Sequence, residues 1–243
     1  MTGIVAAVIL GTISGIAGTG LGGVLAAVWR KPDRRAFATM VGFSGGMMFS
    51  VTVFDLIPES LTAAPLPGVA GALAGMGLMM LTDFLIPRPD TPQPGRSPQY
   101  VHAGLVVGLG IAAHNFAEGL AVGSGYVATA RLGIQIAIII GLHDVPEGMA
   151  LATMLRLGSV RRLAVVVAAA ASGVPMAAGA LAGAIMGNIS RTGLAVSLGA
   201  AGGAMLFVTA RLFPEGTTLR FQTALVSGAI VGMAAGAFLT AAI

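Results

Sequence analysis

The sequence predicts an all-α integral membrane protein, with eight transmembrane helices in a 3+2+3 inverted-repeat bundle. Three observations lead to this prediction. Hydrophobic residues make up 56% of the 243 residues and charged residues only 9%, whereas a soluble domain carries about 25% charged residues. Apolar runs long enough to cross a bilayer recur along the whole chain. Two of these runs carry similar residue patterns although they are expected to cross the membrane in opposite directions.

The apolar runs divide the chain into eight spans of a single transmembrane domain, residues 1–243. A bilayer core about 30 Å thick needs roughly 20 helical residues to cross it. The expected spans are 4–29, 36–60, 66–86, 101–128, 131–155, 161–187, 193–213 and 220–242. Short linkers between them suit closely packed neighbouring helices. The longest break, 87–100, contains five prolines and is expected to be an irregular loop.

Basic residues predict the orientation, because cytoplasmic loops of membrane proteins carry an excess of lysine and arginine. The loops after the first, third, fifth and seventh spans hold Arg30, Lys31, Arg34, Arg35, Arg88, Arg96, Arg156, Arg161, Arg162 and Arg220. The other loops hold only Arg131 and Arg191. We therefore expect a multi-pass protein of the cell (inner or plasma) membrane with both termini outside.

The inverted repeat relates the second and seventh spans. Each carries a glycine pair, a Val-Thr step and a Pro-Glu step, at Gly45-Gly46, Val51-Thr52 and Pro58-Glu59, and at Gly202-Gly203, Val208-Thr209 and Pro214-Glu215. The spacing agrees up to the threonine and is one residue longer in the second span before the proline. The two spans are five apart and so cross in opposite directions, as in the inverted repeats of secondary transporters.

Composition also excludes several classes of function. The chain contains no cysteine, which excludes disulfides, thiolate metal sites and cysteine nucleophiles. The arginines are scattered over loops, and no basic stretch interleaved with aromatic residues is present, so we expect no nucleic-acid partner. Membrane lipid is the expected surrounding.

Six polar side chains gather near the middle of two consecutive spans. They are His114, Asn115 and Glu118 in span 101–128, and His143, Asp144 and Glu147 in span 131–155. Each histidine precedes a glutamate by four residues, so each pair shares one helix face. Ionisable groups at membrane depth are costly and usually mark an ion path or a site. Imidazole and carboxylate ligands without thiolate suit Zn²⁺, Fe²⁺ or Mn²⁺, which predicts a divalent-metal site at the midplane.

Other acidic residues lie in or at the ends of apolar segments. Asp55, Glu59 and Glu215 are candidates for lining a pathway to the site. Asp83, near the end of span 66–86, is expected to be a structural or interfacial partner. Arg211 could neutralise one of these carboxylates, and the sequence leaves open which one.

The segments HNFAEGLAVG (114–123) and HDVPEGMALA (143–152) resemble the paired motifs of the ZIP (Zrt/Irt-like) family of metal transporters, close to its prokaryotic members. The resemblance covers essentially the whole chain, including the Pro-Glu steps of the second and seventh spans. It implies import of divalent metal into the cytoplasm through a binuclear midplane site. It further implies an elevator-like motion of spans 1, 4, 5 and 6 against spans 2, 3, 7 and 8, and a homodimer.

The resemblance maps the six residues of the two motifs onto the site. His114, Asn115, Glu118, Asp144 and Glu147 fall on metal-ligand positions, and His143 falls on a site-lining position that varies in the family. His102 is a candidate exit-side ligand. We expect one well-formed position built by His114, Glu118 and Glu147, with Asn115 and Asp144 offering a second.

This sequence departs from the family pattern in three places. Ala117 stands where the first motif usually has proline. The sixth span often has a glutamate before its proline, but here Val174 precedes Pro175, so one ligand of the second metal position is absent. The loop after the third span lacks a histidine-rich tract.

The resulting prediction is a transporter, not an enzyme, whose bound substrate is a divalent metal, with zinc as first choice and iron, manganese or cadmium as further candidates. One alternative is an intramembrane metal-dependent hydrolase in which Glu118 or Glu147 serves as general base. Another is a proton-coupled carrier for an organic solute, which would use the same carboxylates as a proton relay.

Overall fold

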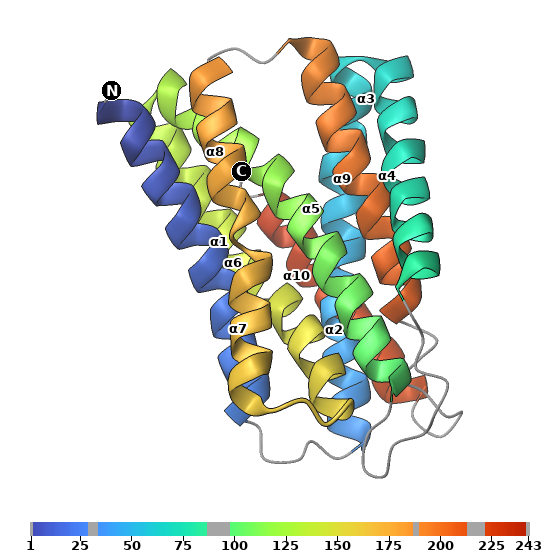
Figure 1. The fold of residues 1–243 in the computed structure, drawn as a ribbon. Coiled ribbons are helices and arrows are strands. Elements are labelled where there is room, and N and C mark those ends of the chain that lie inside the picture. Colours follow the sequence, from blue (N-terminus) through green and yellow to red (C-terminus); the bar gives the residue numbers. More distant parts are fainter. Residues whose placement is uncertain (1, 29–33, 87–97, 187–189, 213–221, 242–243) are drawn as a thin grey trace.

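The computed structural model describes residues 2–28, 34–86, 98–186, 190–212 and 222–241. Within these ranges the chain is helical apart from short connections and contains no strand (Figure 1). The helices are α1 (Thr2–Val28), α2 (Arg34–Val51), the π-helical turn η1 (Thr52–Leu56), α3 (Ile57–Ala63), α4 (Pro65–Leu85), α5 (Pro98–Ala128), α6 (Ala130–Leu157), α7 (Arg162–Ser172), α8 (Pro175–Met186), α9 (Arg191–Leu212) and α10 (Gln222–Ala241).

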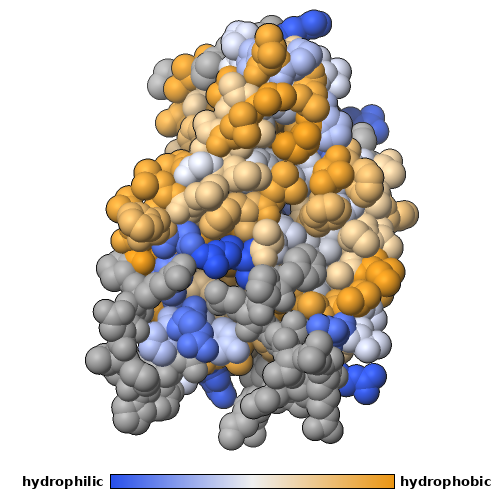
Figure 2. Space-filling view, turned by 90° about the vertical axis from the view of Figure 1, so that its right-hand side faces the viewer, coloured by the Kyte–Doolittle hydropathy of each residue, from blue (hydrophilic) through white to orange (hydrophobic). Residues whose placement is uncertain are grey.

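Eight helical segments in these described ranges are long and apolar enough to cross a membrane. One of them combines α2, η1 and α3, and another combines α7 and α8. Large apolar side chains such as Leu66, Phe84 and Phe238 point outward, and Figure 2 shows hydrophobic residues over much of one face. The predicted all-α membrane protein with eight spanning helices is confirmed.

Four helix pairs run side by side: α1 with α6, α5 with α8, α2 with α10, and α4 with α9. Glycines lie where the paired backbones approach. A Cβ atom on Gly75 of α4 would overlap the carbonyl group of Ala200 in α9, and one on Gly203 of α9 would overlap that of Ala72 in α4. Small residues at these positions allow close helix packing inside a membrane.

The four pairs form two bodies. The α5/α6 body comprises α1 and α5 to α8, and the α2/α9 body comprises α2, η1, α3, α4, α9 and α10. Contacts within each body are far more extensive than contacts between them. The surface where the bodies meet is largely apolar, with Val208 of α9 against Gly110 of α5.

The turn η1 explains the extra residue found in the second span. The N–H of Ile57 donates to the carbonyl oxygen of Thr52, five residues earlier, so this turn holds one residue more than an α-helical turn. The sequence from Thr52 to Pro58 is one residue longer than that from Thr209 to Pro214. The π turn accommodates this residue, and Asp55 lies within it.

The sixth expected span, 161–187, is broken near its middle. Helix α7 ends at Ser172, and α8 begins at Pro175. Proline disfavours helical conformation in the residue before it and has no N–H to donate. The break therefore follows from Pro175, and it exposes backbone carbonyls of the last turn of α7.

Candidate metal centre

The six side chains of the two motifs lie together between α5 and α6. All six are buried, with exposed fractions from 0% for His114, Asn115 and Asp144 to 6% for His143. The helices that carry them are antiparallel neighbours joined by the single residue Thr129. The spacing of four residues places each histidine and glutamate on the face turned toward the other helix.

The two helices meet through histidine–carboxylate contacts. His143 Nε2 lies 2.5 Å from Glu118 Oε1, and His114 Nε2 lies 3.0 Å from the same oxygen. His114 Nε2 is also 3.7 Å from Glu147 Oε1. One carboxylate oxygen of Glu118 therefore faces both imidazoles. The His114 contact meets the distance of a hydrogen bond but not its direction, which leaves both ring nitrogens of His114 without a hydrogen-bond partner.

Many polar atoms at this centre are buried without a hydrogen-bond partner. They are both ring nitrogens of His114, Asn115 Oδ1, Glu118 Oε2, both carboxylate oxygens of Asp144, and Glu147 Oε2. Buried polar atoms are almost always hydrogen-bonded, and an unpaired one costs about 1–3 kcal/mol. A cation bound among these atoms would supply the missing interactions and offset the repulsion among the carboxylates.

Two sets of three residues bring ligand atoms close enough to share one ion. One set is His114, His143 and Glu147, and the other is Glu118, His143 and Asp144; within each set the ligand atoms lie within 4.8 Å of one another. His143 belongs to both sets. The family resemblance assigned His143 to a variable, site-lining position, whereas the geometry puts it at the centre of both candidate positions.

Asn115 is held by the break in the sixth span. Its amide Nδ2 donates to the carbonyl oxygen of Ser172, the last residue of α7, at 3.0 Å. Its Oδ1 is consequently left free to face an ion, and that atom is buried without a partner. No motif in the sequence pointed to Ser172. The signal that could have found it is Pro175, because a proline inside a span frees carbonyls just before it.

Val174 does not face the metal centre. Its side chain is 51% exposed and lies between α7 and α8 at the protein surface. The position where the family pattern often has a glutamate therefore points away from the cluster in this chain, and the centre is built from α5 and α6 with backbone support from α7.

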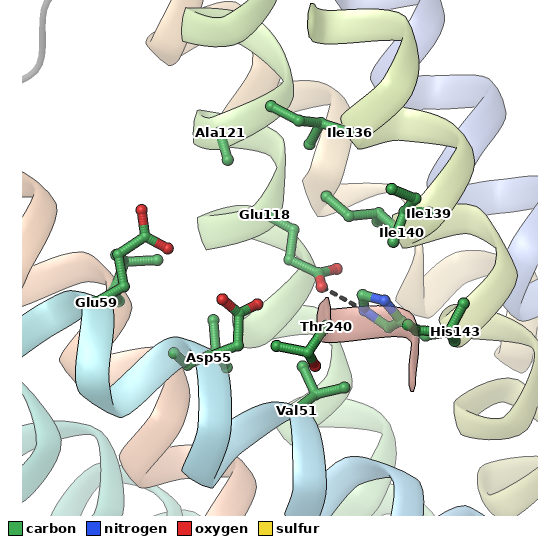
Figure 3. A pocket seen from close by; sticks show the side chains of 13 residues that line it. Val51, Asp55, Glu59, Glu118, Ala121, Ile136, Ile139, Ile140, His143 and Thr240 are labelled. Atoms are coloured by element: carbon green, nitrogen blue, oxygen red, sulfur yellow. Dashed lines mark hydrogen bonds and ion pairs between the residues drawn. The ribbon is translucent and has the colours of Figure 1, made fainter. Parts of the chain in front are cut away.

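A cavity of about 160 Å³ reaches the metal centre from the end of the bundle that carries α3. Its polar lining consists of Asp55, Glu59, Glu118 and His143, with Thr240 of α10 at its side. Figure 3 shows Asp55 and Glu59 on the second span, across from the bonded pair of Glu118 and His143 on α5 and α6. Asp55 and Glu59, which the sequence proposed as pathway residues, thus line one cavity with two residues of the centre.

Beyond the centre, toward the opposite end of the bundle, an apolar core fills the space between the two bodies. It includes Val106 and Ile111 of α5, Leu151 of α6, and Met205 and Val208 of α9, each 2% exposed or less. In this conformation the cavity extends from the centre toward the α3 end, and packed side chains fill the space on the other side of the centre.

The remaining candidate residues lie elsewhere. His102 is near the start of α5, where its Nε2 lies 3.2 Å from the carbonyl oxygens of Asp83 and Ile86. Arg211 pairs with Asp83. The sequence had left open which carboxylate Arg211 would neutralise. Glu215 lies outside the described residues.

Zinc transporters of several bacteria resemble this chain over most of its length, although no family model matches it. The chain is 31% identical over 255 residues to the zinc transporter ZIPB of Bordetella bronchiseptica, covering 97% of this chain and 81% of that protein. It is 27% identical to the zinc transporter ZupT of Akkermansia muciniphila, covering 93% of each. The ZupT protein of Corynebacterium efficiens is 29% identical over 89% of each chain.

These similarities extend over nearly the full length of the chain and accompany eight potential membrane-spanning helices with a buried histidine–carboxylate cluster. The chain belongs to the ZIP family of metal transporters.

Proposed function

We propose that this protein transports zinc across the membrane through the centre between α5 and α6. The observation that carries the proposal is the set of buried nitrogen and oxygen atoms without a hydrogen-bond partner at this centre, which the cavity reaches at Glu118 and His143. A static structural role would require these atoms to be paired within the protein. The names of the relatives, which are zinc transporters, support the choice of ion.

The ligand set fits zinc and does not strictly exclude similar ions. Two imidazoles and three carboxylates converge in the described centre, and zinc binds both ligand types with four ligands in tetrahedral geometry. Iron, manganese and cadmium are secondary candidates, because nitrogen and oxygen ligands also accept other divalent ions.

The proposed direction is import into the cytoplasm. The distribution of basic residues along the sequence supports an α3 end that faces outside. In that orientation the cavity lined by Asp55 and Glu59 opens to the exterior. Its two carboxylates would attract a cation and pass it to Glu118 and His143.

An elevator-type motion of the α5/α6 body against the α2/α9 body is the proposed mechanism. Extensive packing inside each body and the smaller, largely apolar surface between them support it. Because the metal centre lies wholly within the α5/α6 body, that body could carry the ion as a unit and move it past the apolar core.

The helix pairs support an inverted repeat of spans 1–3 and 6–8. Exchanging the first span with the sixth, the second with the seventh, the third with the eighth and the fourth with the fifth maps the four close helix pairs onto one another.

The homodimer stays a prediction that rests on the family resemblance.

Uptake of radiolabelled zinc into sealed proteoliposomes tests the proposal. We expect Glu118→Ala and Glu147→Ala to abolish uptake. Ser124→Ala is the matched control on α5, because the Ser124 hydroxyl bonds only carbonyls of its own helix at Leu120 and Ala121. Full uptake by both glutamate variants would refute the site, and turnover of a lipid or peptide without zinc movement would favour the hydrolase.

A further inference from the structure

A second polar cluster lies at the end of the bundle opposite α3, away from the metal centre. It consists of Asp83 near the end of α4, Arg211 in the last turn of α9, and His102 in the second turn of α5. Arg211 and Asp83 form an ion pair within the α2/α9 body, and the Arg211 guanidinium lies 5.7 Å from the ring centre of Phe207. His102 is the member of this cluster that comes from the α5/α6 body.

His102 joins the two bodies through several contacts at once. Its Nε2 lies 3.2 Å from each of two carbonyl oxygens, those of Asp83 and Ile86, and its Nδ1 lies 3.6 Å from the Asp83 carboxylate. The first carbonyl belongs to Asp83 in the last turn of α4, and the second belongs to Ile86, the residue that follows this helix. The His102 ring is 6% exposed, so it donates to these acceptors out of reach of competing water.

The surroundings of His102 explain why this contact matters. The described surface between the bodies on this side of the centre is made of apolar side chains such as Met79, Val107 and Val208. Inside a membrane, the hydrophobic effect adds little to apolar contacts between helices, since lipid chains are equally apolar. A directional hydrogen bond that is shielded from water favours one relative position of the two bodies over neighbouring positions.

We propose that His102 and the end of α4 held by Arg211 form a latch, which keeps the two bodies together at this end while the cavity is open toward α3. Arg211 fixes Asp83, and with it the end of α4, within the α2/α9 body. His102 then anchors the start of α5 to that fixed end. Movement of the α5/α6 body must separate His102 from both carbonyls. The inference rests on the proposed two-body transport.

The chain has no cysteine, so single cysteines report the conformation of the full protein cleanly. Val208→Cys places a reporter in the closed interface, where Val208 is 0% exposed. Ala121→Cys places one in the wall of the open cavity. Each is combined with His102→Ala, and the rate of labelling by a water-soluble maleimide is measured on purified, metal-free protein.

We expect His102→Ala to raise the labelling rate of the Val208→Cys reporter several-fold and to lower that of the Ala121→Cys reporter. Thr82→Val is the matched control at the same end of α4, because the Thr82 hydroxyl bonds Leu78 within its own helix, and it should leave both rates unchanged. His102→Gln retains an N–H donor and should give a smaller change, and it also serves if the alanine variant does not yield folded protein.

Labelling rates in the His102 variants equal to those of the Thr82→Val control would overturn the latch. A loss of zinc affinity in His102→Ala with unchanged labelling would also overturn it and would make His102 an exit-side ligand. Since labelling is measured without metal or transport, failure of wild-type zinc uptake with the expected labelling pattern would refute the proposed function and leave the latch standing.

Discussion

Glu118 Oε1 lies 2.5 Å from His143 Nε2, and this contact joins the middle of α5 to the middle of α6. The same oxygen faces His114 Nε2 at 3.0 Å. Because imidazole and carboxylate are also the ligands expected for zinc, these contacts hold the donor atoms close together before an ion arrives. An ion that enters must displace the proton shared between Glu118 and a histidine.

Zinc affinity should therefore fall as the pH is lowered. Binding requires neutral imidazoles and ionised carboxylates, so protons compete with the metal and are released when it binds. Titration of the purified protein with zinc against a chelating dye, at a series of pH values from about 8 to about 5, measures the effect. An affinity that stays constant over this range would show that these groups do not bind the ion.

His143→Ala should lower zinc affinity by at least about tenfold, which corresponds to about 1.4 kcal/mol. His143 contributes to both sets of potential ligands, so its loss weakens either position. Calorimetric titration of zinc into the variant and into the Ser124→Ala control measures the change. Equal affinities in the two variants would remove His143 from the metal centre.

Two neighbouring glycines on α4 should respond in opposite ways to substitution by alanine. A methyl group at Gly75 would overlap the Ala200 carbonyl of α9, whereas one at Gly77 would meet no atom within 4 Å. We expect Gly75→Ala to lower the free energy of unfolding by about 1–3 kcal/mol through overpacking. Gly77→Ala should be neutral or stabilising by up to about 1 kcal/mol, because alanine favours helix.

Thermal unfolding of both alanine variants in the same detergent compares them directly. Equal melting temperatures would mean that α4 and α9 do not pack at the close distance described.

Val174→Glu should not add a metal ligand. The Val174 side chain is half exposed on the outer side of the break between α7 and α8, so a carboxylate there would point away from the centre and toward lipid. We expect unchanged zinc stoichiometry by elemental analysis, with reduced thermal stability because a charge at membrane depth is costly. A gain of one bound zinc ion per chain would show that the sixth span can turn its side chain inward.

Much of the fold could be predicted from the sequence because long apolar runs indicate membrane-spanning helices. The apolar runs located the helices, and the spacing of His114 and Glu118, repeated at His143 and Glu147, predicted the face that each pair would share. These side chains do come together in the structure. Such local periodicity needs no knowledge of tertiary packing.

Three features could not be predicted, because they depend on how helices pack. The extra residue before Pro58 was visible in the sequence, but only the backbone of the structure shows that a π turn accommodates it. The carbonyl of Ser172 became a partner of Asn115 only through the placement of α7 against α5. The contacts of His102 with the carbonyls of Asp83 and Ile86 depend on how the start of α5 packs against the end of α4.

Anomalous scattering at the zinc absorption edge, from crystals soaked in zinc, tests the proposed metal centre most directly. We expect a peak between α5 and α6, about 2.0–2.2 Å from a histidine nitrogen and a carboxylate oxygen of the cluster. The number of peaks would also tell whether one or both sets of ligands are occupied. Zinc peaks confined to the surface, with none between the two helices, would contradict a zinc site at this centre.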